Sequence, residues 1–298
     1  MSGSASRPVS QAYADDGFVQ HHMLPRALAA PRARRIGTDV LRMQDDTGQP
    51  AGALLHHGHT RYRWLFELAT NPSILDSVEQ CIGSEDILIW STSLFAKAPH
   101  SPGYVGWHQD ISYWRLEPAD GVITAWLALS DVGDDSGPMR WLRGSHKEPP
   151  RRQVDTYAPD SMLSRGQEIE WAAPVEPQRI ARAVMPAGCF SLHHASIAHG
   201  SAPNTSDGWR IGLAIRYMPC STRSLAAEET AMLARGVDRF GHFLLEQPPG
   251  TDPDNAAVVA QFTRGRELKY RNTMRGAKQK SGHHFKSGAG HQQRRSKI

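Results

Sequence analysis

The chain has 298 residues, of which 39% are hydrophobic and 21% charged, a balance typical of a globular protein with a sizeable core. This composition excludes wholesale disorder and fibrous repeats. The three cysteines form no CxxC pair, which excludes a disulfide framework and a cysteine-rich zinc module. The sequence shows no apolar stretch typical of a signal peptide and no run of 18 apolar residues, so we expect no membrane span and a cytoplasmic location.

The net charge of +4 is unevenly distributed. Residues 264–298 carry eleven Lys or Arg against one acidic residue, which leaves a net charge of −6 on residues 1–263. Residues 276–298 contain almost no apolar side chain and cannot bury enough surface to offset chain entropy. We therefore predict one domain over residues 1–275 and a basic, disordered tail over 276–298. The negative body argues against a nucleic-acid-binding protein, apart from weak contact by the tail.

Taken in chain order, the predicted elements are mainly β. Residues 61–82 predict two helical segments that separate at Asn71-Pro72, with a buried stripe between Ile74 and Ile82. Asp254 is expected to cap a helix that runs to about Tyr270. The strands predicted between these helices cover residues 86–96, 122–129, 180–185, 190–198 and 210–218. This order favours a β-barrel or jelly roll with flanking helices over alternating βαβ units.

The segment His108-Gln109-Asp110 is the sharpest chemical feature. In an extended chain, residues i and i+2 point to one side, so an imidazole and a carboxylate can reach one metal ion. A third ligand is available from His193, His194 or His199. Two histidines and one carboxylate form the facial triad of non-haem iron(II) oxygenases, which leaves positions open for a co-substrate and oxygen.

Arg210 follows His199 by eleven residues and opens a predicted strand. A guanidinium can bind the far carboxylate of 2-oxoglutarate in a bidentate manner. Gly212, Ala214 and Arg216 share its face of the strand, and the small residues would leave room inside a barrel. For Arg216, two positions stay open, the barrel interior and a salt bridge at the surface or rim.

Lys97 ends the strand predicted to begin at residue 86, and it shares a face with Ser91, Ser93 and Phe95. If that face points into the barrel, the buried ammonium needs an anionic partner, such as 2-oxoglutarate or an anionic substrate group. If it does not, Lys97 is a solvent-facing lysine.

From about Tyr13 to Tyr270, the chain resembles the phytanoyl-CoA dioxygenase family of iron(II)- and 2-oxoglutarate-dependent oxygenases. This resemblance implies a double-stranded β-helix, a jelly-roll or cupin-like core, with the metal near one mouth of the barrel. The motifs that carry the resemblance are GWHQDISYW (106–114), TAWLALSD (124–131), GPMRWLRGSH (137–146), MLSRGQEI (162–169), SLHHASIAHGSAPN (191–204) and RIGLAIRY (210–217).

The resemblance also implies the ligands of the metal and of the cofactor. His108, Asp110 and His199 correspond to the iron ligands, and Arg210 corresponds to the anchor of the 2-oxoglutarate carboxylate. His199 is preferred over the two neighbouring histidines because it lies in the HGSxPN context of the family's distal ligand. His193 and His194 are then expected to pack or to form hydrogen bonds near the site.

Further residues are assigned to the cofactor and substrate pockets by the same resemblance or by shared strand faces. Ser201, Trp126 and Lys97 are expected to bind 2-oxoglutarate, although Trp126 also fits a plain core aromatic. The expected substrate contacts are Trp114, Arg216 and Ser93, and for Trp114 a structural role is an equal alternative.

The resulting prediction is an enzyme that uses Fe(II), 2-oxoglutarate and O2 to hydroxylate a C–H bond of a small polar or anionic molecule. Amino acids, phosphonates and natural-product intermediates fit this description. Halogenating relatives replace the carboxylate ligand with a small residue, so Asp110 favours hydroxylation. Desaturation, cyclisation and epimerisation use the same ligands and stay open, as does a non-catalytic metal-binding sensor. The protein is expected to be a monomer or homodimer.

Overall fold

The computed structural model describes residues 7–278. The tail predicted for residues 276–298 lies outside the described residues from residue 279 onward. No helix within the described range has the length and apolar character needed to cross a membrane. The α-helices are α1 Val9–Asp16, α2 Ala30–Thr47, α3 Ala51–Leu54, α4 Arg63–Ala69, α5 Pro72–Ile82, α6 Ile111–Trp114 and α7 Ala256–Thr273. Short 3-10 helices are η1 His21–Met23, η2 Gly58–Thr60, η3 Ala119–Gly121, η4 Ser145–Lys147 and η5 Pro177–Arg179.

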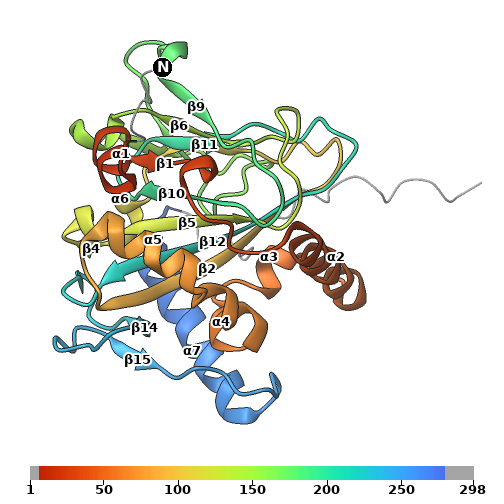
Figure 1. Cartoon of the computed structure of the whole chain (residues 1–298), viewed down its shortest axis with the longest axis vertical. Helices are drawn as coiled ribbons and strands as arrows, with labels where there is room; N and C mark the ends of the chain where they lie inside the picture. The colour runs from red at the N-terminus through yellow and green to blue at the C-terminus, as the bar shows by residue number, and fades with distance from the viewer. Residues whose placement is uncertain (1–6, 279–298) are drawn as a thin grey trace, which may run out of the picture.

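The strands form two main sheets that face each other. The larger sheet has the order β1-β10-β5-β12-β2-β14-β15 and the smaller one β3-β11-β6-β9. In Figure 1, β6, β9 and β11 lie above β5, β12 and β2, and α4 and α5 cover the front of the larger sheet. The strands are β1 Phe18–Val19, β2 Ile87–Lys97, β3 Val105–His108, β4 Leu116–Glu117, β5 Ile123–Ala128, β6 Met139–Leu142, β7 Gln153–Asp155, β8 Gln167–Ile169, β9 Ile180–Arg182, β10 Phe190–His194, β11 His199–Ser201, β12 Arg210–Pro219, β13 Arg223–Ser224, β14 Thr230–Arg235 and β15 Leu244–Glu246.

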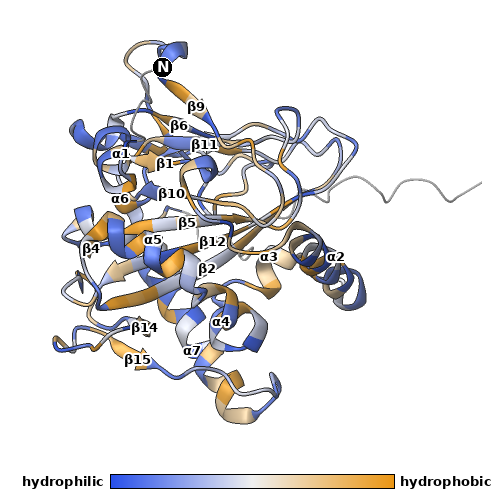
Figure 2. Cartoon of the chain, in the orientation of Figure 1, coloured by the Kyte–Doolittle hydropathy of each residue, from blue (hydrophilic) through white to orange (hydrophobic). Residues whose placement is uncertain are grey.

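This architecture confirms the predicted fold class, a mainly β jelly roll with flanking helices. Strand pairing in both main sheets is antiparallel except between β14 and β15, which run parallel. Figure 2 shows apolar residues gathered on the central strands and the exposed helix α2 largely hydrophilic.

Strand β12 separates two hydrophobic cores. Its residues Ile211, Leu213 and Ile215 belong to the core that α4 and α5 complete on the outer face of the larger sheet. Ala214, which points the other way, belongs to the core inside the barrel, with Trp126 of β5. Successive side chains of a β-strand point to opposite faces of the sheet, so the apolar residues of β12 pack into the cores on both sides of it. This alternation also confirms that Arg210, Gly212, Ala214 and Arg216 share the interior face.

The helical break predicted at Asn71-Pro72 is confirmed. The Oδ1 of Asn71 accepts a hydrogen bond from the backbone N–H of Ser73, at 3.0 Å, and Pro72 occupies the first turn of α5. Both features favour a helix start at this point. The predicted cap of the last helix was one residue early, because Asn255 caps α7 by accepting from the N–H of Ala257. Asp254 instead pairs with Arg61, at 2.7 Å.

The strand predicted over residues 190–198 was wrong in one respect. β10 ends at His194, and a turn follows in which His194 Nδ1 accepts from the N–H of Ser196, at 2.9 Å. The chain then enters the smaller sheet as β11, which begins at His199. This turn moves His199 from the larger sheet into the smaller one, beside β3. Helix α2 and the pair β14–β15 were not predicted from the sequence.

Replacing Gly212 by alanine should destabilise the fold. A Cβ at this position would lie 1.8 Å from Cζ2 of Trp126, so the indole must move within a packed core. Overpacking of this kind costs about 1–3 kcal/mol of unfolding free energy, measurable by urea denaturation. Gly208→Ala is the control, since no atom lies within 4 Å of its added Cβ, and it should change stability by less than about 0.5 kcal/mol. Equal losses in the two variants would contradict this account of the core.

Candidate active site

His108 and Asp110 meet by a route that the sequence did not predict. His108 ends strand β3, but Asp110 has helical angles, φ −56° and ψ −45°, and begins the turn of α6. The two residues are therefore not neighbours on one face of a strand. The helical turn brings the Asp110 carboxylate back to 3.3 Å from Nε2 of His108.

His199 completes a cluster with these two residues. β11 pairs with β3 so that His199 lies directly opposite His108, and the ring centroids are 4.1 Å apart. Nε2 of His199 is 3.9 Å from the second carboxylate oxygen of Asp110. The three side chains are buried, and their donor atoms lie close enough together to hold one metal ion. The structure thus gathers the three residues predicted as iron ligands.

Backbone carbonyls orient both imidazoles. Nδ1 of His108 faces the carbonyl oxygen of Gly106 at 2.9 Å, and Nδ1 of His199 faces that of Ile197 at 3.0 Å. Each Nδ1 therefore carries the proton, and each Nε2 is left as the lone-pair donor. Burial, reinforced by the nearby His108, lowers the pKa of His199 to about 4, so this ring is neutral at neutral pH, as a metal ligand requires.

The carboxylate is held in its charged form. Burial alone would raise the pKa of Asp110, but its contacts with His108 and His199, together with the nearby guanidinium of Arg216, lower it well below the usual value. A buried carboxylate beside two imidazole nitrogens is a donor set that suits a divalent cation.

The two other histidines of the segment take different roles. His194 accepts from the backbone of Ser196, which shapes the turn after β10. The ring of His193 lies 4.8 Å from that of His199, and neither of its nitrogens has a hydrogen-bond partner among residues 7–278. His193 thus packs against the cluster, as predicted.

Two buried basic side chains meet beside the cluster. Nη2 of Arg210 donates to the carbonyl of Gly137 at 3.1 Å and to Oγ of Ser201 at 3.3 Å. Nζ of Lys97 donates to the same hydroxyl at 2.8 Å and to the carbonyl of Ala202. The guanidinium carbon of Arg210 also lies 5.5 Å above the ring of Trp126. The structure therefore groups the four residues predicted to bind the cofactor.

Within residues 7–278, no ion pair joins Lys97 or Arg210 to a carboxylate. Burial, with smaller contributions from Arg210 and Arg140, lowers the pKa of Lys97 to about 5, and burial lowers that of Arg210 to about 10. Basic groups in this state favour an anion that enters from outside.

Arg216 lies in the interior, which rejects the rim position. Its Nη1 donates to Oγ of Ser93 at 2.7 Å, and its guanidinium carbon lies 5.3 Å above the ring of Trp114. A bulge in β2 helps to build this region, because Arg216 pairs with Ser91 and Tyr217 with Ile89, which leaves Trp90 as the extra residue. The structure thus groups the three residues predicted to contact substrate.

Two adjoining cavities open on the metal cluster. One has a volume of about 500 Å³, including open solvent, and is lined by His199, Ser201, Arg210 and Trp126. Lys97 lies behind Ser201 and does not line this cavity. The other, of about 850 Å³ including open solvent, is lined by Trp90, Ser93, Trp114 and residues of α7. Phe95, His108, Asp110, Leu163 and Arg216 line both cavities. We call the first the inner cavity and the second the outer cavity.

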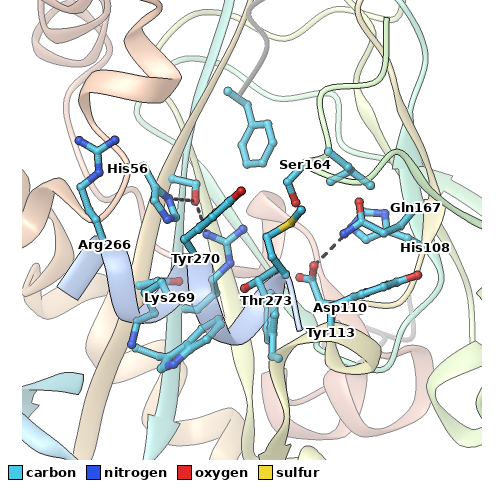
Figure 3. Close-up of a pocket in the computed structure, with 18 residues that line it drawn as sticks. His56, His108, Asp110, Tyr113, Ser164, Gln167, Arg266, Lys269, Tyr270 and Thr273 are labelled. Carbon is cyan, nitrogen blue, oxygen red and sulfur yellow. Dashed lines mark hydrogen bonds and ion pairs between the residues drawn. The ribbon is translucent and has the colours of Figure 1, made fainter. Parts of the chain in front are cut away.

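Helix α7 forms a wall of the outer cavity that was missed from the sequence. Figure 3 shows Arg266, Lys269, Tyr270 and Thr273 of this helix across the cavity from His108 and Asp110. A second buried cluster, His57, His59 and Glu246, was also missed. The HHGH segment at residues 56–59 was its visible signal, but Glu246 comes from a strand far away in the chain.

Lys97→Met should stabilise the cofactor-free protein. With the pKa lowered from 10.5 to about 5 in the folded state, Lys97 takes up a proton on unfolding between these pH values. The unfolding free energy of the wild type therefore falls as the pH drops from about 10 to about 5, and the variant loses this part of the pH dependence. Urea denaturation at about pH 6 and about pH 9 measures the difference.

The same variant should bind 2-oxoglutarate about tenfold more weakly, because Ser201 loses a hydrogen bond that holds its hydroxyl in the inner cavity. Lys147→Met is the control, since Lys147 is exposed and pairs only loosely with Asp15, at 3.6 Å. If Lys97→Met binds 2-oxoglutarate as tightly as the wild type and its unfolding free energy has the same pH dependence, Lys97 neither supports the binding of 2-oxoglutarate nor destabilises the cofactor-free protein.

Comparisons with known proteins agree with this geometry. The family described as phytanoyl-CoA dioxygenase (PhyH) matches residues 18–212, well over half of the chain. Peroxisomal phytanoyl-CoA dioxygenase of Bos taurus is 26% identical over 173 residues, which cover 56% of this chain and 50% of the bovine protein. The 1-deoxypentalenic acid 11-beta-hydroxylase of Streptomyces arenae is 27% identical over 197 residues, 62% of this chain and 67% of that enzyme. The chain thus spans about half the length of the mammalian relatives it matches.

Solved structures extend the likeness over nearly the whole chain. The non-heme monooxygenase ThoJ superposes with a TM-score of 0.77 and 29% identity, covering 90% of this chain and 98% of its own. Structures at 18–22% identity show the same fold, and their titles include an iron and α-ketoglutarate complex, an epimerase and a carbocyclase. The chain therefore belongs to the phytanoyl-CoA dioxygenase family, within the iron- and 2-oxoglutarate-dependent oxygenases, as the motifs predicted.

Proposed function

We propose that this protein hydroxylates a C–H bond of a small polar or anionic molecule, with Fe(II), 2-oxoglutarate and O2. The observation that carries the proposal is the inner cavity, which is lined both by the His108–Asp110–His199 cluster and by Arg210. A group of two histidines and one carboxylate that can bind a metal would by itself suit many functions. When a buried arginine without an acidic partner lies beside it, the site suits a metal ion together with an anionic co-substrate.

His108, Asp110 and His199 would hold the iron. Both histidines present Nε2, and the one carboxylate leaves coordination positions for 2-oxoglutarate and oxygen. When bound, the metal and 2-oxoglutarate supply the oxidising chemistry, in which decarboxylation to succinate and CO2 activates oxygen. The part of the protein is to hold the ligands in place and to keep the site dry.

Arg210 and Ser201 would bind the far carboxylate of 2-oxoglutarate. Both line the inner cavity, and the indole of Trp126 forms a wall beside them. Lys97 acts from behind as a positioning residue, since its Nζ donates to Oγ of Ser201. A carboxylate at this point favours the charged ammonium of Lys97, so cofactor binding and proton uptake are coupled.

The outer cavity would hold the substrate. Its lining combines the rings of Trp90, Trp114 and Tyr113 with the guanidinium groups of Arg216 and Arg266. The only carboxylate that lines it within the described range is Asp110, which is committed to the metal. Aromatic walls with fixed positive charge suit a small molecule that carries an apolar body and an anionic group. Ser93 holds the Arg216 side chain in position, at 2.7 Å.

Hydroxylation is proposed because Asp110 completes a set of two histidines and one carboxylate. The carboxylate occupies the coordination position that a halide would need, and the other open positions are taken by 2-oxoglutarate and oxygen. Desaturation, cyclisation and epimerisation use the same ligands, and product analysis separates them from hydroxylation. A cytoplasmic location and a monomeric or homodimeric state remain part of the proposal.

Anaerobic addition of Fe(II) and 2-oxoglutarate should produce the weak visible charge-transfer band of a metal-bound 2-oxoacid. Asp110→Ala should lose the band, because the buried anionic ligand is gone. Arg210→Met should need at least about tenfold more 2-oxoglutarate to reach the same absorbance, because charge-assisted hydrogen bonds are lost. Absorbance titration under argon measures both effects, and admission of oxygen should then release succinate.

Arg182→Met is the matched control, since Arg182 is exposed and pairs with Asp134 on the surface. It should titrate as the wild type does. A folded, iron-loaded wild type that develops no band would refute the oxygenase proposal and favour a non-catalytic metal sensor.

A further inference from the structure

A second cluster of metal-ligating side chains lies outside the proposed active site. His57 and His59 flank Gly58 at the start of η2, and Glu246 ends β15. Both histidines are fully buried, and Glu246 is 5% exposed. The three donor atoms lie close enough to one another to hold one ion. None of the three residues lines the inner or the outer cavity, so this cluster is closed where the first is open.

The geometry of the cluster repeats that of the proposed iron site. Nε2 of His57 is 2.7 Å from one carboxylate oxygen of Glu246, and Nε2 of His59 is 3.9 Å from the other. The corresponding separations around Asp110 are 3.3 Å and 3.9 Å. Two imidazole nitrogens and one carboxylate therefore converge in both places with nearly the same spacing.

Two of the converging atoms have no hydrogen-bond partner within residues 7–278. They are Nε2 of His59 and the second carboxylate oxygen of Glu246, and both are buried. Leaving a buried polar atom unpaired is costly. A cation between these atoms would satisfy both.

Neighbouring groups hold the cluster in this arrangement. Nδ1 of His59 lies 3.1 Å from Oγ1 of Thr92, which turns Nε2 of the same ring toward Glu246. His57 has a positive φ of 60°, an uncommon conformation for a residue other than glycine, and its N–H donates to the carbonyl of Thr92. A Cβ at Gly265 of α7 would lie 2.5 Å from Glu246 and 2.6 Å from His57. The helix backbone therefore closes over the cluster.

The pairing of charged side chains around Glu246 also favours a cation. Glu246 is buried, and within residues 7–278 no lysine or arginine forms an ion pair with it. The ammonium of Lys269, on α7, is paired with Glu229 at 2.7 Å. A buried carboxylate without a lysine or arginine partner is a suitable ligand for a cation.

We propose that His57, His59 and Glu246 bind a second divalent cation, which joins β15 to the segment around η2, beneath α7, and has a structural role. Zinc is the ion that fits best, because it accepts imidazole and carboxylate ligands and is not redox-active, which suits a structural role. Three protein donors leave one position of tetrahedral coordination to a water molecule. The neighbouring His56 and the α7 residue Arg266 line the outer cavity, so the ion would also stabilise the wall of the substrate site.

The test measures zinc in a full-length variant that lacks two of the three proposed iron ligands, His108→Ala/Asp110→Ala. After chelator treatment and dialysis against zinc, this variant should retain about one zinc per chain by elemental analysis, and the wild type about two. Its thermal midpoint should rise by about 5 °C at a zinc concentration 100-fold above Kd. Adding His59→Asn should remove the remaining zinc.

His59→Asn is chosen because the shorter amide can keep the contact with Thr92 while it removes the Nε2 donor. Far-UV circular dichroism checks that the triple variant is folded. If it is not, cobalt(II) added to the double variant decides, since a tetrahedral nitrogen–oxygen site produces visible absorption.

A folded double variant that retains no zinc, develops no cobalt absorption and keeps its thermal midpoint would overturn the proposal. Glu246 and His57 would then form only a hydrogen-bonded pair. Because the double variant lacks two of the three proposed iron ligands, this failure would leave the oxygenase proposal untouched. Loss of the charge-transfer band in the wild type would equally leave the second site untouched.

Discussion

The site depends on two buried basic side chains that the protein itself does not neutralise. Lys97 and Arg210 share the hydroxyl of Ser201 inside the barrel, and no carboxylate pairs with either within residues 7–278. A protein gains nothing in stability from such an arrangement, since burial disfavours both charged forms. The cost is explained if an anion from solution completes the site. Function here opposes stability, a conflict that is common at binding sites.

The fold makes this arrangement possible by burying both faces of the same strands. The outer face of β12 packs on helices, while its inner face carries Arg210, Gly212, Ala214 and Arg216. The small residues Gly212 and Ala214 leave room for the indole of Trp126. Of the two arginines, Arg210 lines only the inner cavity, whereas Arg216 lines both cavities. One strand thus contributes basic side chains to the proposed cofactor pocket and to the proposed substrate pocket.

Sequence patterns predicted the parts of this site that depend on local geometry or on known motifs. The shared faces of β2 and β12 were predicted because strand alternation is regular. The metal cluster and Arg210 were predicted because the motifs that carry the family resemblance are specific when they occur together. The extended conformation predicted for Asp110 was wrong, since a helical turn begins there. The α7 wall and the His57–His59–Glu246 cluster were missed, because they depend on contacts between segments far apart in the chain.

The most direct test of the account is an anaerobic crystal structure of the wild type with Fe(II) and 2-oxoglutarate. Iron should lie on His108, Asp110 and His199, and the far carboxylate of 2-oxoglutarate should lie within hydrogen-bond distance of Arg210 and Ser201. Lys97 should remain behind Ser201, on its hydroxyl. A 2-oxoglutarate molecule whose far carboxylate is bound elsewhere, with the pocket around Arg210 filled only by water, would contradict this account.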